Sequence, residues 1–248
     1  MQANYHTHSR WCRHGKGEIK EYIEEAIRCG LQEIAITEHV PHRPPESSWI
    51  PWEQFPAYDE ALNRAVETYS DQIRVIKGFE CEYYPMEMDT YREFRDKYGY
   101  KLLILGHHRC GKKKEIDVFG PKGPDELHIY ADEVCEGLET GLFRFLAHPD
   151  CVFEKYPAQW DKDCESIMRQ IFRTCERLDI PVEINGNGLR GKRRYPSEEA
   201  FRLSKEYRLQ YLISSDAHAP EYVYDEACRE AEKFAQRLGL HVMPLMDL

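Results

Sequence analysis

The sequence predicts an α/β fold in which seven strand–helix units form a barrel. Short apolar runs alternate along the chain with longer amphipathic stretches, which is the pattern of repeated βα units. The length of 248 residues suits an α/β barrel built as one domain. No change of composition marks a linker. We therefore expect a single domain over residues 1–248.

Seven segments are predicted as strands. The first is the extended stretch around residues 5–8, and the others are the apolar runs 34–36, 73–76, 102–105, 143–147, 181–184 and 211–214. Runs this short and this apolar are typical of parallel strands buried on both faces. The carboxyl ends of such strands meet at one rim of a barrel, where barrel enzymes place their chemistry.

Amphipathic stretches between these runs are predicted as helices. They cover residues 19–27, 58–69, 125–139, 163–178, 197–206 and 224–238. Gly30 is expected to end the first helix, because glycine readily adopts the left-handed conformation found there. Two long loops, 41–56 and 110–124, remain between predicted elements, and loops of that length usually serve a site or a lid.

The first strand carries a pair of potential metal ligands, His6 and His8. Side chains two residues apart in a strand point to the same face, so both imidazoles can bind one cation. A histidine pair near an N-terminus can also be a tag remnant or a solvated tail. The recurrence of histidine and acidic residues after later apolar runs favours the metal site.

Seven of the eleven histidines lie at predicted strand ends. These are His6, His8, His39, His107, His108, His148 and His218. Each one alone could be a histidine of the core, but Glu80 and Asp216 occupy equivalent positions, and together the set predicts a metal centre. Imidazole combined with carboxylate suits zinc, iron or manganese.

Composition excludes several classes of function. The net charge of −10 and the pI near 5.6 disfavour a general nucleic-acid or anionic-membrane binder. Nine cysteines, an odd number without a C-x-x-C pair, suggest neither a disulfide framework nor a zinc ribbon, so we expect them reduced and mostly buried. No secretory leader is visible, and no apolar run approaches the ~20 residues that span a bilayer. We therefore expect a cytoplasmic protein.

The sequence also resembles a known family. Six motifs carry the resemblance: the His6-x-His8 opening, His14-Gly15, Glu38-His39, Gly78-x-Glu80, Ala147-His148-Pro149 and Asp216-Ala217-His218. They resemble the motifs of the polymerase and histidinol phosphatase (PHP) family over nearly the whole chain. The segments 11–15, 183–190 and 215–218 look most like its stand-alone histidinol-phosphatase branch. The resemblance implies a distorted (β/α)7 barrel with a trinuclear metal centre.

The resemblance also implies three ligand sets. They are His6, His8, Glu80 and Asp216 for one metal; the bridging Glu80, His108 and His148 for a second; and His14, His39 and His218 for a third. For the fourth strand the family pattern favours His108 over His107. His107 would then pack beside the site or point to the outer layer.

The implied ligands predict phosphomonoester hydrolysis by a metal-bridging hydroxide. Adjacent cations bring the pKa of a shared water from 15.7 to about 7 and neutralise phosphate oxygens. Asp216 is expected to accept the proton of the nucleophile. His218 or His42 is expected to assist the leaving alkoxide.

Two basic clusters support an anionic substrate. Arg109 precedes the lysines at 112–114, and Arg190 precedes the basic residues at 192–194. Arg190 is the first choice for binding phosphate, because its guanidinium can hold two oxygens at once. For the lysines, solvated loop charge is an equally good interpretation.

Histidinol phosphate is the leading candidate among small phosphorylated metabolites. The loop Arg109-Cys110-Gly111-Lys112 departs from the family pattern, which more often has an aromatic or aliphatic residue after the ligand. Trp49 and Trp52 are expected either to stack on a ring of the substrate or to cover the surface. Another small phosphate or nucleotide remains an alternative, as does C–N bond hydrolysis. A nuclease would need a track for a polyanion, which the acidic charge disfavours.

Overall fold

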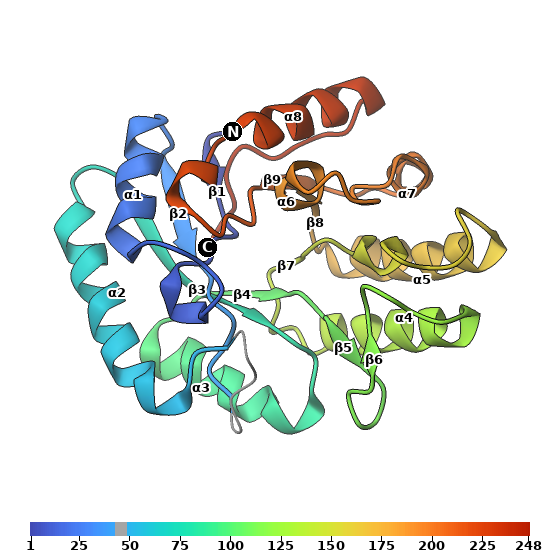
Figure 1. The fold of residues 1–248 in the computed structure, drawn as a ribbon, viewed down its shortest axis with the longest axis horizontal. Helices are drawn as coiled ribbons and strands as arrows, with labels where there is room; N and C mark the ends of the chain where they lie inside the picture. The colour runs from blue at the N-terminus through green and yellow to red at the C-terminus, as the bar shows by residue number, and fades with distance from the viewer. Residues whose placement is uncertain (43–48) are drawn as a thin grey trace.

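The computed structural model describes residues 1–42 and 49–248, so part of the predicted loop 41–56 lies outside the described residues. Parallel strands lie at the centre and helices lie around them, which confirms the distorted (β/α)7 barrel (Figure 1). The described residues form a seven-stranded sheet in the order β1-β2-β3-β4-β7-β8-β9. Its strands are β1 Ala3–Asn4, β2 Glu33–Ile36, β3 Arg74–Cys81, β4 Leu102–Leu105, β7 Phe145–Leu146, β8 Val182–Asn185 and β9 Tyr211–Ser214.

The two edges of this sheet meet just beyond the ends of β1 and β9. Thr7 and Ala217 form a parallel bridge, and the His8 amide donates to the Ala217 carbonyl at 2.8 Å. The side-chain Nδ2 of Asn4 also donates to the Val223 carbonyl at 2.9 Å. These contacts bring the first and last predicted metal-ligating segments together.

Alternation along the strands separates an inner core from an outer one. In β4, Leu102 and Ile104 face the barrel interior, whereas Leu103 and Leu105 pack under the helices. Both faces are apolar because both are buried. Met246 from the C-terminal segment joins the inner core, and its amide donates to the Tyr5 hydroxyl at 2.9 Å.

The helices pack around the strands. They are α1 Ile19–Arg28, α2 Phe55–Tyr69, α3 Met88–Tyr98, α4 Pro124–Glu139, α5 Lys162–Leu178, α6 Gly186–Arg190, α7 Glu198–Leu203 and α8 Glu226–Leu238. Gly30 follows α1 with a φ of 75°, as expected. All nine cysteines fall within the described residues and are free, and all but Cys29 are buried. Of the helices formed by the described residues, none has the length and apolar composition needed to cross a bilayer.

The structure adds elements that the sequence analysis does not predict. Helix α3 follows β3 and buries Met88, Tyr91 and Phe94, whose spacing is helical although the segment is strongly polar. The predicted loop 110–124 contains part of an antiparallel hairpin, β5 Arg109–Cys110 with β6 Ile116–Asp117. Helix α6 begins where the Asn185 side chain accepts the Gly188 amide at 3.0 Å.

Strand β3 is also longer than predicted, and the extension places Glu80 inside the barrel. Ile76, Gly78 and Glu80 alternate with outward residues on this strand, so Glu80 points to the interior. On the neighbouring strand, Gly106 follows β4 and leaves room for the Glu80 side chain. A Cβ at Gly106 would lie 1.9 Å from Glu80 Oε1.

Gly106→Ala is therefore expected to displace the Glu80 carboxylate and weaken metal binding ~10- to 100-fold, the size of effect seen when ligand support is lost. Metal affinity is measured by competition with a chromophoric chelator. Gly120→Ala is the matched control, because its Cβ would meet no atom of the described residues closer than 3.9 Å. Equal metal affinity in both variants would contradict this role of Gly106.

Candidate metal centre

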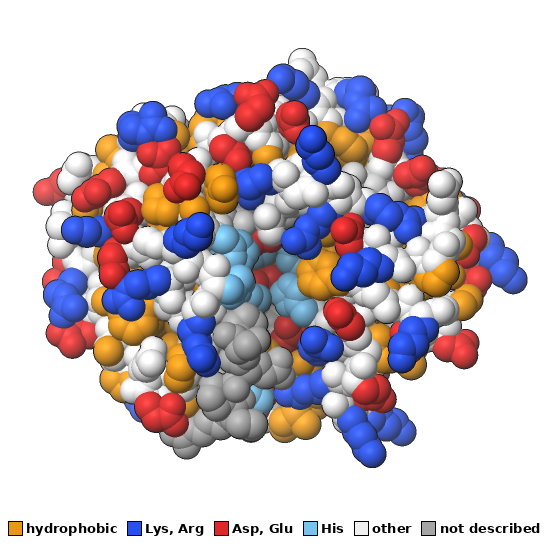
Figure 2. All heavy atoms as spheres, viewed as in Figure 1, with side chains coloured by type: hydrophobic (Ala, Val, Ile, Leu, Met, Phe, Trp, Pro, Cys, Tyr) orange, Lys and Arg blue, Asp and Glu red, His pale blue; other side chains and the backbone are white. Residues whose placement is uncertain are grey.

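The predicted ligands converge at the carboxyl ends of the strands, in a pocket of about 420 Å³. Figure 2 shows histidine side chains gathered in a hollow on this face, with acidic side chains among them. Eight residues predicted for the site line the pocket: His14, His39, Glu80, His108, Arg109, His148, Asp216 and His218. His6 and His8 are fully buried among these ligands.

Glu80 is at the centre of this arrangement. Its two carboxylate oxygens lie 3.1–3.4 Å from ring nitrogens of His6, His8, His39, His108 and His148. Oε2 faces the rings of His6, His8 and His39, and Oε1 faces the other two. Glu80 can therefore bridge two cations, one at each oxygen.

Asp216 faces the same two buried histidines from the last strand. Its Oδ1 lies 3.8 Å from His6 Nε2 and 3.5 Å from His8 Nε2. Its Oδ2 accepts hydrogen bonds from the side-chain amides of Asn187 at 3.1 Å and Asn185 at 3.3 Å. One oxygen is thus held by the protein while the other faces the ligand cluster.

The buried donors fit metal ions. Among the described residues, His6 Nε2 and both ring nitrogens of His8 are buried without a hydrogen-bond partner. A buried polar atom left unpaired costs about 1–3 kcal/mol, so such atoms call for a ligand. Within the described part of the chain, potential ligand atoms lie within 4.8 Å of one another in five groups, two of which are His6, His148 and Glu183, and His8, Cys12 and Glu38. The other three groups overlap and consist of predicted ligands alone: His6, His8 and Asp216; His8, His39 and Glu80; and Glu80, His108 and His148. Shared members indicate a site for more than one metal.

The residues of the third implied set also lie together. His14 Nε2 and His218 Nε2 are 2.7 Å apart, and the His14 and His39 ring centroids are 5.3 Å apart. The Nδ1 atoms of His14 and His218 lie 3.0 Å from the carbonyls of Cys12 and Asp216. Both rings therefore turn Nε2 toward the pocket.

The pKa values of two histidines and two carboxylates in the site are all lowered, which favours metal binding. Burial lowers the pKa of His39 to about 3 and lowers the pKa of His8. Burial also opposes ionisation of Glu80 and Asp216, but the surrounding histidines outweigh it and keep both carboxyl pKa values low. Both carboxylates are thus charged and ready to bind cations.

The pKa values of three other histidines are raised rather than lowered. Burial tends to lower the pKa of His6, His108 and His148, but nearby carboxylates outweigh it and raise all three pKa values. For His6 the strongest of these carboxylates is Glu183. In the metal-free protein, protons therefore compete for these three ring nitrogens.

Two buried carboxylates behind the ligands were not predicted as site residues. Glu183 Oε1 lies 2.8 Å from His6 Nδ1, and Glu82 Oε1 lies 2.8 Å from His108 Nδ1. Carboxylates in these positions orient a metal-binding imidazole. The sequence signal that could have identified them is an acidic residue inside or directly beside an apolar strand, as in the run 181–184.

The backbone is unusual at two of the predicted ligands. Asp216 and His148 have φ values of 46° and 30°, a region that non-glycine residues seldom adopt. Such conformations persist where the surrounding structure enforces them, and they cluster at functional sites. Here they turn each side chain from its strand end into the pocket.

His107 and His108 point in different directions. His108 Nε2 lies 3.4 Å from Glu80 Oε1 and belongs to the ligand cluster. His107 Nε2 lies 2.8 Å from Glu133 on α4, and its Nδ1 accepts the Tyr83 amide at 3.2 Å. His107 therefore faces the outer layer of the barrel.

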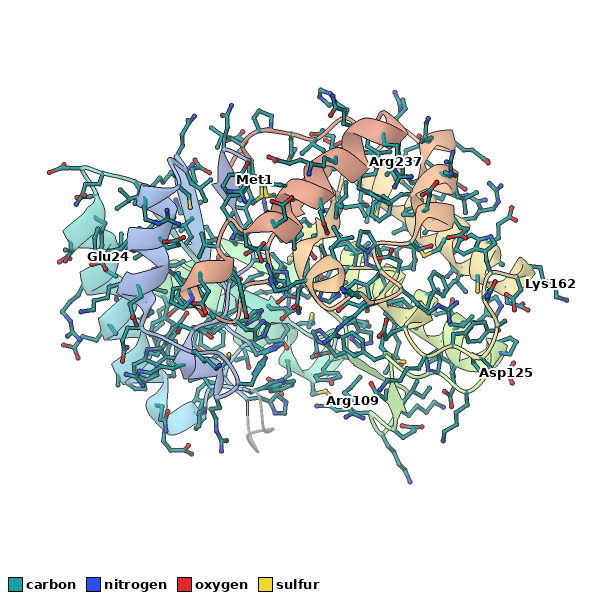
Figure 3. The ribbon with its side chains drawn as sticks, turned by 45° about the horizontal axis from the view of Figure 1, so that its top comes forward. Met1, Glu24, Arg109, Asp125, Lys162 and Arg237 are labelled. Atoms are coloured by element: carbon teal, nitrogen blue, oxygen red, sulfur yellow. The ribbon has the colours of Figure 1, made fainter. Side chains whose placement is uncertain are left out.

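The predicted basic residues are placed unequally. Arg109 lines the pocket at the start of the β5–β6 hairpin, where it is labelled in Figure 3. Arg190 does not line it. Its guanidinium binds Asp225, with Nε to Oδ2 at 2.7 Å and Nη2 to Oδ1 at 3.1 Å, and donates to the Ser215 carbonyl at 3.2 Å. Arg193, from the same basic cluster, lines the pocket instead.

His42 also lies outside the pocket lining. It is buried, with Nε2 3.1 Å from Glu87 Oε1, and its ring packs edge-on against Trp49 at 4.5 Å between centroids. Trp49 does line the pocket, together with Phe119 and Tyr195. Trp52 packs instead near Phe55 and Phe94.

Comparison with known proteins agrees with this geometry. A family model described as the PHP domain matches residues 4–187. A probable histidinol-phosphatase of Schizosaccharomyces pombe is 26% identical over 253 residues, covering 90% of this chain and 82% of the relative. A probable histidinol-phosphatase of Deinococcus radiodurans is 22% identical, covering 87% and 85%.

Solved structures show the same fold. A histidinol phosphate phosphatase of Lactococcus lactis, crystallised with zinc, L-histidinol and phosphate, superposes with a TM-score of 0.78 at 19% identity, covering 98% of this chain and 95% of that one. The family model spans well over half of the chain. The chain therefore belongs to the PHP domain family.

Proposed function

We propose that this protein is a metal-dependent phosphomonoesterase acting on a small phosphorylated metabolite, with L-histidinol phosphate as the favoured substrate. The observation that carries the proposal is the Glu80-centred ligand cluster opening into a pocket that also holds Arg109 and Arg193. Carboxylate and imidazole ligands bind the cations, and the guanidinium groups bind the anionic ester.

Two to three divalent cations, zinc, iron or manganese, fit the three ligand sets. Such ions activate water as a nucleophile and neutralise phosphate oxygens. His6, His8 and Asp216 hold one position, and Glu80, His108 and His148 hold the next. His14, His39 and His218 form the third, at the edge of the pocket.

Proton transfers are assigned to side chains that face the pocket. Asp216 Oδ1 is the proposed acceptor, because its Oδ2 is already held by Asn185 and Asn187. With only two cations bound, Nε2 of His218 would be free of metal, and His218 is then the proposed donor to the leaving alkoxide, since its side chain is 24% exposed and lines the pocket. His42 is less well placed, because it does not line the pocket, whereas Trp49, which its ring contacts, does.

The other half of the pocket suits a substrate with a ring. Phe119 and Tyr195 lie 6.2 Å apart between ring centroids, and Trp49 lines the same pocket. Aromatic walls of this kind bind flat rings such as imidazole. The histidinol-phosphatase relatives in Schizosaccharomyces pombe and Lactococcus lactis favour the same substrate. C–N bond hydrolysis is less favoured, because it has little need for two arginines.

The proposal is tested by measuring metal content and phosphate release on one sample. We expect about two to three divalent ions per chain and strong preference for L-histidinol phosphate over a panel of phosphomonoesters and nucleotides. Slow and indiscriminate release would keep the reaction class but reject this substrate. A fully metallated protein that releases no phosphate from any ester would reject the proposed function.

Arg193→Ala is expected to raise KM for the phosphate ester ~10- to 100-fold, because a hydrogen bond to a charged group is worth about 1.5–3 kcal/mol. Steady-state kinetics measure the change. Lys192→Ala is the control, since Lys192 is exposed and lies outside the pocket lining.

Arg190→Ala separates the two arginines. Because Arg190 is bound to Asp225, its loss should lower the thermal unfolding temperature more than it changes KM. A large KM increase for Arg190→Ala with none for Arg193→Ala would return the phosphate-binding role to Arg190.

Metal affinity is expected to fall as the pH is lowered. His6, His108 and His148 have raised pKa values in the metal-free protein, so metal binding must displace protons from these rings. Each displaced proton weakens binding by ~10-fold per pH unit below the pKa. Chelator competition between about pH 6 and pH 8 measures the slope, and affinity independent of pH would contradict it.

A further inference from the structure

We propose that Glu183 is a positioning residue of the metal centre, which holds His6 as the tautomer that binds metal through Nε2 and holds the backbone of His148 in its unusual conformation. The inference rests on metal binding in the proposed function and goes beyond it by assigning a role to a side chain outside the ligand sets. Glu183 lies on β8 and is fully buried.

One oxygen of Glu183 determines where the proton of His6 lies. Glu183 Oε1 is 2.8 Å from His6 Nδ1, and a carboxylate oxygen can only accept. Nδ1 must therefore carry the hydrogen. His6 Nε2 is left with its lone pair, 3.4 Å from Glu80 Oε2 and 3.8 Å from Asp216 Oδ1, where the ligand atoms gather.

The other oxygen reaches a second ligand. Glu183 Oε2 accepts the His148 amide at 2.9 Å. His148 has a φ of 30°, so this hydrogen bond supports a backbone conformation that is disfavoured for a side chain with a Cβ. The ring of His148 then reaches Glu80 Oε1 at 3.1 Å.

The same oxygen connects Glu183 to Asp216. The Asn185 side-chain amide donates to Glu183 Oε2 at 2.9 Å and lies 3.3 Å from Asp216 Oδ2. One buried carboxylate thus contacts two ligands directly and a third through Asn185. These ligands follow β1, β7 and β9, which are far apart in the sequence.

Only a carboxylate satisfies this environment. Within the described part of the chain, Glu183 has three hydrogen-bond partners, the His6 ring, the His148 amide and Asn185 Nδ2, and each presents a donor to its oxygens. Glutamine has nearly the same shape but offers one acceptor oxygen and one NH₂ group. With its NH₂ at the Oε2 position, the glutamine faces the two donors of His148 and Asn185. With its NH₂ at the Oε1 position, it faces His6 Nδ1, which can accept only if the ring proton moves to Nε2, the atom proposed to bind metal.

Glu183→Gln is the first test. We expect it to fold but to bind divalent metal ~10- to 100-fold more weakly, with fewer ions retained per chain after dialysis. Zinc is the probe, measured by elemental analysis and chelator competition. Circular dichroism and thermal unfolding check the fold.

Glu33→Gln is the matched control. Glu33 is a buried carboxylate on β2 that bonds the Tyr5 hydroxyl and Arg74 Nη1, and among the described residues it makes no hydrogen bond or ion pair to a ligand of the metal site. It should retain the zinc affinity of the wild type even if its stability falls. Wild-type zinc affinity in Glu183→Gln would overturn the proposal, and so would equal weakening in both variants.

A second measurement needs no variant. In the zinc-loaded wild type, nitrogen–proton correlation spectra should show His6 with its proton on Nδ1, hydrogen-bonded to a carboxylate. A proton on Nε2 of His6 would overturn the proposal even if Glu183→Gln failed to fold. Failure of the proposed function is distinguishable: a wild type that binds zinc but hydrolyses no ester would leave the role of Glu183 intact, whereas one that binds no zinc would overturn both.

Discussion

The interaction on which this site depends is the contact between one buried carboxylate and five imidazole rings. Glu80 is 2% exposed, and an isolated carboxylate in that position would be strongly destabilising. Its oxygens face ring nitrogens of His6, His8, His39, His108 and His148 at 3.1–3.4 Å, which keeps it charged. Two of these nitrogens, Nε2 of His6 and Nε2 of His8, lack a hydrogen-bond partner within the described residues, so bound cations would satisfy atoms that the protein leaves unpaired.

Several features of the barrel place this carboxylate among its ligands. Strand β3 runs far enough to bring Glu80 to the interior, and Gly106 at the end of β4 leaves space for it. The bridge between Thr7 and Ala217 then joins the segments that carry the first and last ligands. A second layer of carboxylates, Glu183 and Glu82, orients the rings from behind. The ligands are thus held from both sides, which suits a site that must keep its geometry during turnover.

Prediction from sequence succeeded where a periodic signal and a strand end coincided. Seven strands were predicted and seven are observed in the sheet of the described residues, and seven of the nine predicted ligands fall in the overlapping groups of potential ligand atoms. Local patterns say less where the outcome depends on which partner lies nearby. Arg190 and Arg193 are three residues apart in one basic cluster, but Asp225 binds Arg190, and Arg193 is the one of the two that lines the pocket. Helix α3 was missed because its few apolar residues are embedded in a highly charged segment.

By itself, the sequence determined the class of fold and the ligand types, because both follow from local patterns: apolar runs of strand length, and histidine or acidic residues directly after them. Family motifs then pointed to the same residues, and the match to the PHP domain agrees with them. Only the tertiary structure decided which partners the remaining polar groups contact. His107 contacts Glu133 on α4, the ring of His42 contacts Trp49, and Glu183 contacts Nδ1 of His6. These contacts depend on distances between elements of the folded chain. A sequence pattern carries no record of those distances, since they arise only when the barrel closes.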